Sequence, residues 1–312
     1  MKFPDPITLP VDVECMRAQR QAELIRSARL GICIRLTIIL FELFGVYLIH
    51  SSALLLDALS SLMDLFSTIF LIFCIKLAQR PPDRNHPFGH GRYEPMGGLF
   101  LGLIFTAIGG FTFFQQIGGA LDREQTLLIH PFGWIFPAAA MVLLELSYRF
   151  IMRTAKRTHS PAIAADAVHY RIDGISSLFA TLALLAAVYY PAWSHAIDHA
   201  GAALISLFML LMGILAAKTN FHQLMDRIPD GQFFDLVKQA ALLVEGVWGT
   251  EKIRIQLYGP DAHVDIDVEV DPALSVLEAH QISQLVRAEI QKKWPAVRDV
   301  TVHIEPYFPN DH

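Results

Sequence analysis

The sequence has few cysteines and few charged side chains, and each shortage excludes a class of protein. Its three cysteines show no CxxC spacing, so we expect neither a disulfide framework nor a thiolate zinc finger. Charged residues make up 18% of the chain, whereas an ordinary soluble domain carries about a quarter. The net charge of −5 argues against a nucleic-acid partner. The first residues lack a short apolar core with a small-residue cleavage site, so we expect no cleaved signal peptide.

Apolar residues are in excess, at 53% of the 312 residues, and they are gathered into long blocks. A helix that crosses a bilayer needs about 20 mostly apolar residues. We predict transmembrane spans over residues 30–49, 53–77, 96–119, 132–152, 163–189 and 196–217. From about Gln223 onward the composition is that of a soluble domain. The sequence therefore predicts an α-helical membrane protein with six transmembrane helices, followed by a small soluble domain.

The distribution of basic residues predicts how the spans are oriented. Lys and Arg gather before span one, between spans two and three, between spans four and five, and after span six. Because cytosolic loops carry the basic excess, we expect both termini in the cytosol. The predicted parts are a cytosolic N-terminal segment at 1–28, a six-helix transmembrane domain at 29–222 and a cytosolic domain at 223–312.

The soluble part has the pattern helix, strand, strand, helix, strand. The segments EKIRIQLYG and HVDIDVEVD alternate between apolar and polar residues, as half-buried strands do. Ser275 and Glu278 form an S-x-x-E capping box, which marks the start of the second helix. We therefore predict a small cytosolic α+β domain of order αββαβ.

Polar side chains inside the spans need an explanation, because a central Asp costs about 2.5–3.5 kcal/mol on insertion scales. Span two carries Asp57, Ser60 and Asp64 on one helical face, and span five carries His169 and Asp173 one turn apart. An imidazole and carboxylates converging from facing helices can hold a divalent metal ion. With no cationic partner evident beside the carboxylates, we expect a metal site formed by Asp64, His169 and Asp173.

Several polar residues in the spans have a second interpretation. A hydrogen-bond network that only joins helices would explain the serines, since polar residues also stabilise membrane bundles. Asp57 either belongs to the metal site or lines an aqueous cavity. Arg35 and Glu42 lie seven residues apart on one face of span one, and we expect a structural ion pair with each other or with neighbours.

Three stretches of the sequence resemble the cation diffusion facilitator family of dimeric, proton-coupled metal exporters. ALSSLMDLFST on span two is similar to the family's first metal half-site. ADAVHYRIDGISS on span five is similar to the second half-site, and DRNHPFGHGRYEP is similar to the cytosolic loop. The resemblance extends over nearly the whole chain. It implies a bacterial divalent-metal/proton antiporter of the ferrous-iron/zinc efflux type, with a metallochaperone-like C-terminal domain.

The first half-site departs from the family pattern. The family usually has Asp, His or Asn four residues before the second carboxylate of span two, where this sequence has Ser60. Ser60, a water molecule or Asp57 would complete the metal's ligands. A nitrogen-rich set would favour zinc, whereas this oxygen-rich set leaves iron(II), manganese, cobalt and cadmium open beside zinc.

Two further metal sites are predicted outside the spans. Asp83, His86 and His90 form a DxxHxxxH set after span two, which can bind one zinc-like ion if the loop folds back; the alternative is an exposed loop with incidental histidines. In the C-terminal domain, the resemblance implies a metal cluster of five residues, although its acidic members would also solubilise a strand face. These residues are Glu251, Asp267, His280, His303 and Glu305.

The resemblance also implies how the protein is held together and where it lies. Arg92 and Asp226 match an ion pair between a transmembrane helix and the segment that leads into the soluble domain. We expect a homodimer in the bacterial inner membrane, with divalent metal ions (Zn²⁺ or Fe²⁺) and protons as its substrates and no prosthetic group.

These features favour a transporter over an enzyme. The leading hypothesis is metal efflux by proton antiport, and the alternative is a metal-binding sensor or partner subunit that does not transport. An intramembrane metallohydrolase is disfavoured because no span carries HExxH. A passive channel is disfavoured because tight charged ligands trap ions.

Overall fold

The structure is a computed structural model that describes residues 11–78, 80, 82–121, 130–158, 161–259 and 261–308. Within its helices some side chains are not described, among them those of Asp166 and His169. The described residues divide into two compact units, which we treat separately. The helical unit comprises Ala22–Ile72 and Gly98–Lys218. The sheet unit comprises the described residues up to Gln21, with Phe73–Gly97 and the chain from Thr219 onward.

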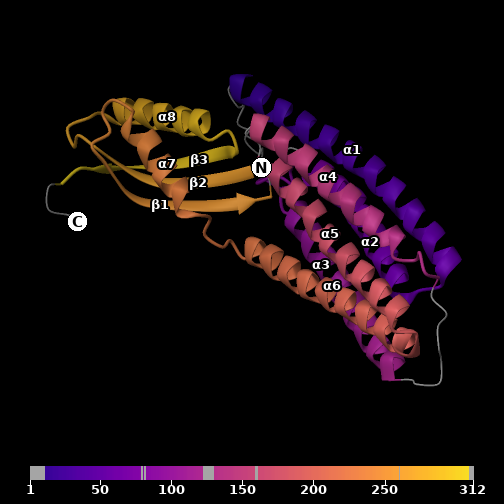
Figure 1. Cartoon of the computed structure of the whole chain (residues 1–312). Helices are drawn as coiled ribbons and strands as arrows, with labels where there is room; N and C mark the ends of the chain where they lie inside the picture. The colour runs from indigo at the N-terminus through magenta and orange to yellow at the C-terminus, as the bar shows by residue number, and fades with distance from the viewer. Residues whose placement is uncertain are drawn as a thin grey trace. The chain divides into compact units, whose positions relative to one another are not determined.

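Six long helices confirm the predicted transmembrane spans (Figure 1). They are α1 (Val11–Ile49), α2 (Ser52–Ala78), α3 (Tyr93–Leu121), α4 (Ile135–Thr158), α5 (Pro161–Tyr189) and α6 (Ser194–Leu224). All six are long and apolar enough to cross a membrane. Many of their large apolar side chains are exposed, as expected of helices surrounded by lipid. The largest difference from the prediction is in α1, which begins at Val11, well before the predicted start of the first span at residue 30.

Small residues allow helices of the helical unit to approach closely. A Cβ atom placed on Gly102 of α3 would lie 2.5 Å from the backbone nitrogen of Ala217 in α6. A Cβ on Gly213 of α6 would lie 2.5 Å from the backbone nitrogen of Thr106 in α3. Such contacts drive helix association where lipid removes the hydrophobic effect between helices. The bundle is therefore held by backbone proximity as well as by side-chain packing.

A buried carboxylate fixes the start of α2. Asp198 of α6 is fully buried and accepts hydrogen bonds from the backbone nitrogens of Ser52, at 2.6 Å, and Ala53, at 3.2 Å. The Ser51 hydroxyl also donates to it. The first backbone N–H groups of a helix have no partner within the helix, and an anion is favoured at this end. Asp198 thus joins the N-terminus of α2 to α6.

The sheet unit has the predicted helix–strand–strand–helix–strand order. It contains α7 (Gly231–Leu242), β1 (Gly249–Tyr258), β2 (Asp261–Val270), α8 (Val276–Lys293) and β3 (Val297–Pro306). The strand order is β1-β2-β3, with β1 antiparallel and β3 parallel to β2. A parallel neighbour requires a crossover connection, and α8 supplies it. The predicted soluble α+β fold is confirmed.

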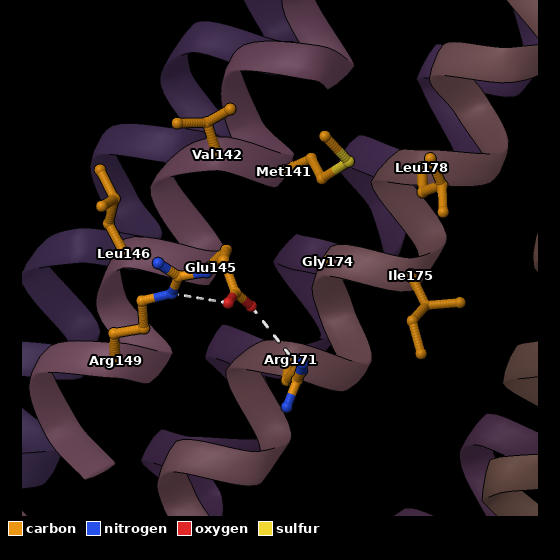
Figure 2. Close-up of a pocket in the computed structure, with 9 residues that line it drawn as sticks. All are labelled: Met141, Val142, Glu145, Leu146, Arg149, Arg171, Gly174, Ile175 and Leu178. Atoms are coloured by element: carbon orange, nitrogen blue, oxygen red, sulfur yellow. Dashed lines mark hydrogen bonds and ion pairs between the residues drawn. The ribbon is translucent and has the colours of Figure 1, made fainter. Parts of the chain in front are cut away.

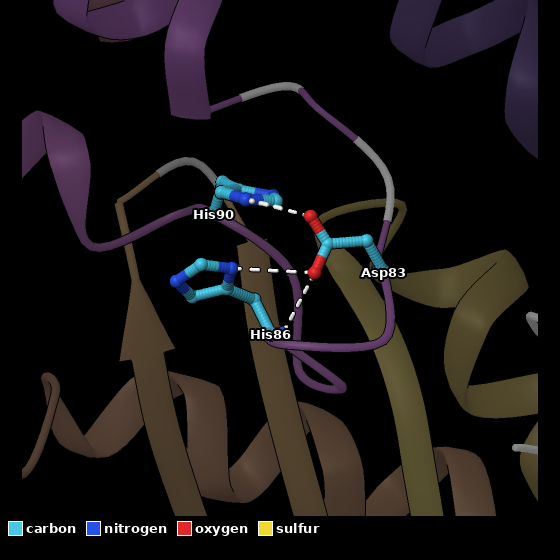
Figure 3. Close-up of side chains that lie close together, drawn as sticks. All are labelled: Asp83, His86 and His90. Atoms are coloured by element: carbon cyan, nitrogen blue, oxygen red, sulfur yellow. Dashed lines mark hydrogen bonds and ion pairs between the residues drawn. The ribbon is translucent and has the colours of Figure 1, made fainter.

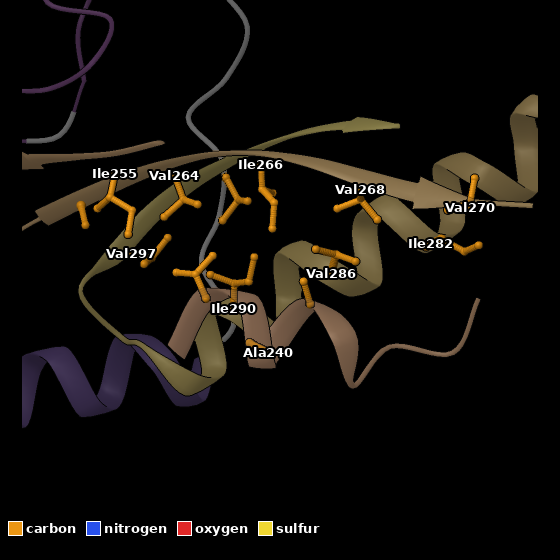
Figure 4. Close-up of a cluster of buried hydrophobic side chains, with 14 residues drawn as sticks. Ala240, Ile255, Val264, Ile266, Val268, Val270, Ile282, Val286, Ile290 and Val297 are labelled. Atoms are coloured by element: carbon orange, nitrogen blue, oxygen red, sulfur yellow. The ribbon is translucent and has the colours of Figure 1, made fainter. Parts of the chain in front are cut away.

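One face of the sheet packs against α7 and α8 (Figure 4). Val264, Ile266 and Val268 of β2 are buried against Val286 and Ile290 of α8. Because side chains alternate along a strand, the residues between them, such as Asp267, lie on the opposite face. The same alternation in β3 places His303 and Glu305 on that opposite face. This arrangement positions the candidate metal ligands of the sheet unit.

The predicted capping box at the start of α8 is present. The backbone nitrogen of Glu278 donates to the Ser275 hydroxyl oxygen at 3.3 Å, and the Ser275 nitrogen donates to the Glu278 carboxylate at 2.8 Å. These hydrogen bonds from Ser275 lower the pKa of Glu278. The ionised carboxylate of Glu278 therefore stabilises the fold at pH values above the ordinary pKa of Glu. This stabilisation is lost as the pH falls through the lowered pKa.

We predict that Ser275→Ala destabilises the first turn of α8, because loss of a serine N-cap costs about 1 kcal/mol. Hydrogen exchange of the full-length protein should show faster exchange of the amides that open α8. Ser283→Ala makes the same chemical change within α8 and should leave these amides unaffected. Equal exchange in Ser275→Ala and the wild type would contradict the role assigned to the cap.

Candidate functional site

Two carboxylates from different helices converge in the interior of the helical unit. Asp64 of α2 and Asp173 of α5 both face the guanidinium group of Arg35 from α1. Arg35 Nη2 lies 2.8 Å from Asp173 Oδ2, and Arg35 Nη1 lies 3.5 Å from Asp64 Oδ2. Arg35 is only 4% exposed. The three side chains form one ion-paired group that joins three helices.

Arg35 corrects the expectation that these carboxylates have no cationic partner. It also pairs with them, and not with Glu42, among the residues that the structure describes. Arg35 and Glu42 lie two helical turns apart on α1. Their spacing in the sequence places them on one face of that helix but says nothing of contacts with other helices. Which residues of α2 and α5 face Arg35 depends on how the helices pack. The available signal was the cost of a charged side chain inside a span, which demands a partner of opposite sign.

A second pair of carboxyl groups lies in the same interior. Glu42 of α1 and Asp57 of α2 are both almost completely buried, and Asp57 accepts a hydrogen bond from Ser177 at 3.2 Å. Asp57 interacts electrostatically with Glu42, Asp64 and Asp173. Four carboxyl groups therefore lie in this interior, and the guanidinium group of Arg35 pairs with two of them, Asp64 and Asp173. Charges of one sign that are this close in a medium of low dielectric constant attract cations or bind protons.

The other predicted members of the transmembrane site are placed only in part. Ser60 is half-buried in α2, one turn before Asp64. His169 lies in α5, one turn before Asp173, but its side chain is outside the described part of the structure. The described carboxylates thus come from the two helices that the sequence predicts.

Tyr170 and Gly31 hold the Arg35 side chain in place. The Tyr170 ring is buried, and the guanidinium carbon of Arg35 lies 4.8 Å from its centroid. This is within the range of a cation–π interaction. A Cβ atom at Gly31 of α1 would overlap the Tyr170 hydroxyl group. Glycine is therefore needed where α1 passes this ring.

In the sheet unit, the loop residues Asp83, His86 and His90 gather as one of two groups of described residues that could hold a metal ion (Figure 3). Asp83 lies 3.3 Å from His86 Nδ1 and 3.4 Å from His90 Nε2. The Asp83 carboxylate also accepts hydrogen bonds from the backbone nitrogens of His86 and Asn85, which lower its pKa. The loop does fold back on itself. This cluster offers one carboxylate and two imidazoles to a cation.

The second group lies on the open face of the sheet. Asp267 of β2 pairs in register with His303 of β3, and Glu305 follows two residues later. His303 Nδ1 lies 3.0 Å from Glu305 Oε1 and 3.6 Å from Asp267 Oδ1. Lys252 lies 3.8 Å from Asp267. Two carboxylates and one imidazole therefore converge where metal can reach them from solvent.

Glu251 and His280 are not part of this group, which corrects the five-residue cluster expected from the resemblance. His280 lies on α8, and α8 packs against the other face of the sheet. Glu251 is exposed in a stretch of β1 where the strand register shifts. Strand alternation could be read from the sequence, but the face covered by α8 and the irregularity in β1 could not.

Arg92 and Asp226 lie together in the sheet unit. Arg92 Nη2 is 3.2 Å from Asp226 Oδ1, and both side chains are well exposed to solvent. Arg92 also lies over the Tyr258 ring, 5.0 Å from its centroid. An exposed ion pair contributes about 0–1 kcal/mol. The additional contact with Tyr258 ties the start of α3 to β1.

A groove of about 410 Å³ between α4 and α5 is a poorer candidate for a metal site (Figure 2). Its carboxylate, Glu145, lies 2.8 Å from Arg149 and 3.7 Å from Arg171. Most of the remaining lining is apolar, as Met141 and Leu178 illustrate. Two arginines already balance the acid, so this groove offers no set of metal ligands.

Two family descriptions together match nearly the whole chain. The family description "Cation efflux transmembrane domain" matches residues 28–225, and "Cation efflux protein, cytoplasmic domain" matches residues 229–307. The chain belongs to the cation efflux family. This family, also called the cation diffusion facilitators, transports divalent metal cations, so the chain is a multi-pass membrane protein of a transporter family.

Relatives of this cation efflux protein match over most of their length. An uncharacterized transporter of Methanocaldococcus jannaschii is 31% identical over 252 residues, covering 78% of this chain and 85% of the relative. The manganese efflux system protein MneS of Bacillus subtilis is 28% identical over 280 residues, covering 90% and 94%. The magnetosome protein MamM of Magnetospirillum gryphiswaldense is 26% identical over 279 residues, covering 88% and 86%.

One solved structure is similar to part of this cation efflux protein. A cadmium form of the MamM C-terminal domain is 27% identical and covers 25% of this chain and 98% of that chain, with a TM-score of 0.25.

We predict that the cluster of Asp267, His303 and Glu305 binds a transition-metal ion, and that His303→Ala abolishes this binding. Equilibrium dialysis of the detergent-solubilised protein against Zn²⁺ would measure the metal bound per chain. The matched control is His280→Ala, which removes an exposed histidine of the same domain outside the cluster. Equal losses in the two variants, or a larger loss in His280→Ala, would contradict the assignment.

Proposed function

We propose that this protein exports a divalent transition-metal ion from the cytosol in exchange for protons. Asp64 and Asp173, together with His169, would bind the ion during transport. The observation that carries the proposal is the convergence of Asp64 and Asp173 from α2 and α5 in the buried interior of the helical unit. Buried ionisable residues of membrane proteins commonly mark ion pathways.

The charge balance of this interior supports a cation as the transported species. Asp64 and Asp173, with Glu42 and Asp57 in the same interior, provide four carboxyl groups, and Arg35 provides one permanent positive charge. A divalent cation would offset most of the negative charge that remains when all four are ionised. Carboxylate oxygens and a serine hydroxyl favour hard or borderline ions, which fits Mn²⁺, Fe²⁺ and Zn²⁺ better than Cu⁺.

Proton exchange follows from the chemistry of the ligands. Carboxylates and imidazole bind metal only when deprotonated, so protons and metal compete for the same side chains. On the acidic side of the membrane, protonation would release the metal. An inward proton gradient would then drive export of the metal.

The site residues outside the spans have a supporting role in this proposal. The loop cluster of Asp83, His86 and His90 and the sheet cluster around His303 would bind cytosolic metal. We propose a homodimer in the bacterial inner membrane with both termini in the cytosol, in which metal binding brings the two soluble domains together. The match of residues 229–307 to the family's cytoplasmic domain supports this role.

A second function is favoured by two observations. Arg35 already neutralises part of the charge of both carboxylates, and Ser60 stands where the family usually has a stronger ligand. A metal-binding sensor or partner subunit that does not transport would tolerate both features. Such a protein would bind metal in solution but would move none across a membrane.

We predict that Asp173→Asn reduces metal transport at least about tenfold, which corresponds to about 1.4 kcal/mol of lost stabilisation. Proteoliposomes with an imposed pH gradient would be tested with Zn²⁺, Fe²⁺, Mn²⁺, Co²⁺ and Cd²⁺. Asp235→Asn makes the same change on the exposed surface of α7 and should transport as the wild type does. Metal binding without gradient-dependent transport of any ion would reject the antiporter and support the sensor.

We also predict that Ser60→His shifts transport toward zinc. The substitution adds an imidazole nitrogen one turn before Asp64, and nitrogen ligands favour Zn²⁺ over Mn²⁺. The ratio of Zn²⁺ to Mn²⁺ uptake in the same vesicles should rise severalfold. Ile69→His, which places the same side chain on the exposed face of α2, is the control. An unchanged ratio in Ser60→His would exclude position 60 from the metal's ligands.

A further inference from the structure

Arg35 is placed where a bound metal ion would also be held. Its guanidinium group contacts one carboxylate from each of the two helices of the proposed site, at 2.8 Å to Asp173 and 3.5 Å to Asp64. Its side chain is almost completely buried and lies against the Tyr170 ring. A residue that only joined α1 to one neighbour would need one carboxylate. Arg35 instead contacts a carboxylate on each of two neighbouring helices, α2 and α5.

The chemistry of arginine makes this contact a form of competition. A guanidinium group is planar, carries several N–H donors in a fixed fork and stays charged at any physiological pH. The charge cannot be removed by loss of a proton, as it could be for lysine or histidine. A metal ion that takes both carboxylates as ligands must therefore displace the guanidinium group from at least one of them.

We propose that Arg35 is a built-in cation that competes with the transported metal for Asp64 and Asp173. The inference rests on the proposed function of these carboxylates as metal ligands. In the metal-free protein, Arg35 offsets the charge of the two carboxylates and holds α1, α2 and α5 together. When a metal ion binds, it replaces the tethered cation, and the guanidinium group keeps the Tyr170 ring as its partner.

This competition makes a prediction opposite to that of a purely structural role. If Arg35 competes with the metal, its removal leaves two carboxylates available, and metal binds more tightly. If Arg35 only supports the site, its removal lets the carboxylates move apart, and metal binds more weakly. The sign of the change in affinity therefore separates the two roles.

The test measures equilibrium binding of Mn²⁺ and Cd²⁺ to the full-length protein in detergent at one pH. A background carrying His90→Ala and His303→Ala removes one imidazole from each exposed cluster, so that the transmembrane site dominates. In this background, Arg35→Gln should lower Kd by about tenfold or more, equivalent to about 1.4 kcal/mol. Arg35→Lys keeps the charge but loses the planar fork, so its Kd should lie between the two.

The control is Arg149→Gln, which removes an exposed arginine of the same bundle that pairs with Glu145. Its Kd should equal that of the background. Should Arg35→Gln fail to fold, the comparison becomes Arg35→Gln with Asp64→Asn against Asp64→Asn alone. Competition for Asp173 then predicts tighter binding in the double variant.

The outcomes distinguish this inference from the proposed function. Binding that depends on Asp173 but is unchanged or weaker in Arg35→Gln overturns the competition alone. If adding Asp173→Asn leaves Kd unchanged both with Arg35 and with Arg35→Gln, the proposed metal site is overturned, and the competition with it. Tighter binding in Arg35→Gln that is lost again on adding Asp173→Asn supports both.

Discussion

The ion-paired group of Arg35, Asp64 and Asp173 is the interaction on which the helical unit depends most. Each charge alone would be strongly disfavoured in the interior of a membrane protein. Together they are tolerated, because the distances of 2.8 and 3.5 Å allow each charge to offset the other. Breaking such a group by removing one partner is costly, since it leaves an uncompensated buried charge. The group therefore constrains how α1, α2 and α5 can be arranged.

The rest of the bundle places these helices so that the group can form. Glycine at position 31 admits the Tyr170 ring, and that ring lies against the guanidinium group of Arg35. The buried carboxylate of Asp198 fixes the start of α2, the helix that carries Asp64. Small residues between α3 and α6 allow close backbone contact. Contacts between helices far from Asp64 and Asp173 thus determine where these proposed metal-binding carboxylates lie.

The sequence predicted those parts of the molecule that depend on local pattern. The length of the apolar blocks predicted the six spans, and alternation predicted the strands. The spacing of Asp83, His86 and His90 predicted a group of three candidate ligands on one loop. Features that depend on packing between elements were missed. The partners of Arg35 follow from the rotation of α1 relative to α2 and α5, and no spacing within one span reveals it. His280 was misplaced for the same reason, because the sheet face that α8 covers is a tertiary property.

Burial explains why an arginine accompanies only one of the three sets of candidate ligands. The loop and sheet clusters lie at the surface, where water screens their carboxylates and also the lysine beside the sheet cluster, Lys252, which lies 3.8 Å from Asp267. A metal ion can therefore bind there with little competition from a protein cation. In the helical unit Asp64 and Asp173 are largely buried, so a cation or bound protons must offset their charge when the metal is absent, and Arg35 supplies such a cation. On the proposed function, the surface clusters respond to cytosolic metal by simple addition, whereas the buried site exchanges one cation for another. The same ligand types then serve for sensing or for transport according to the dielectric around them.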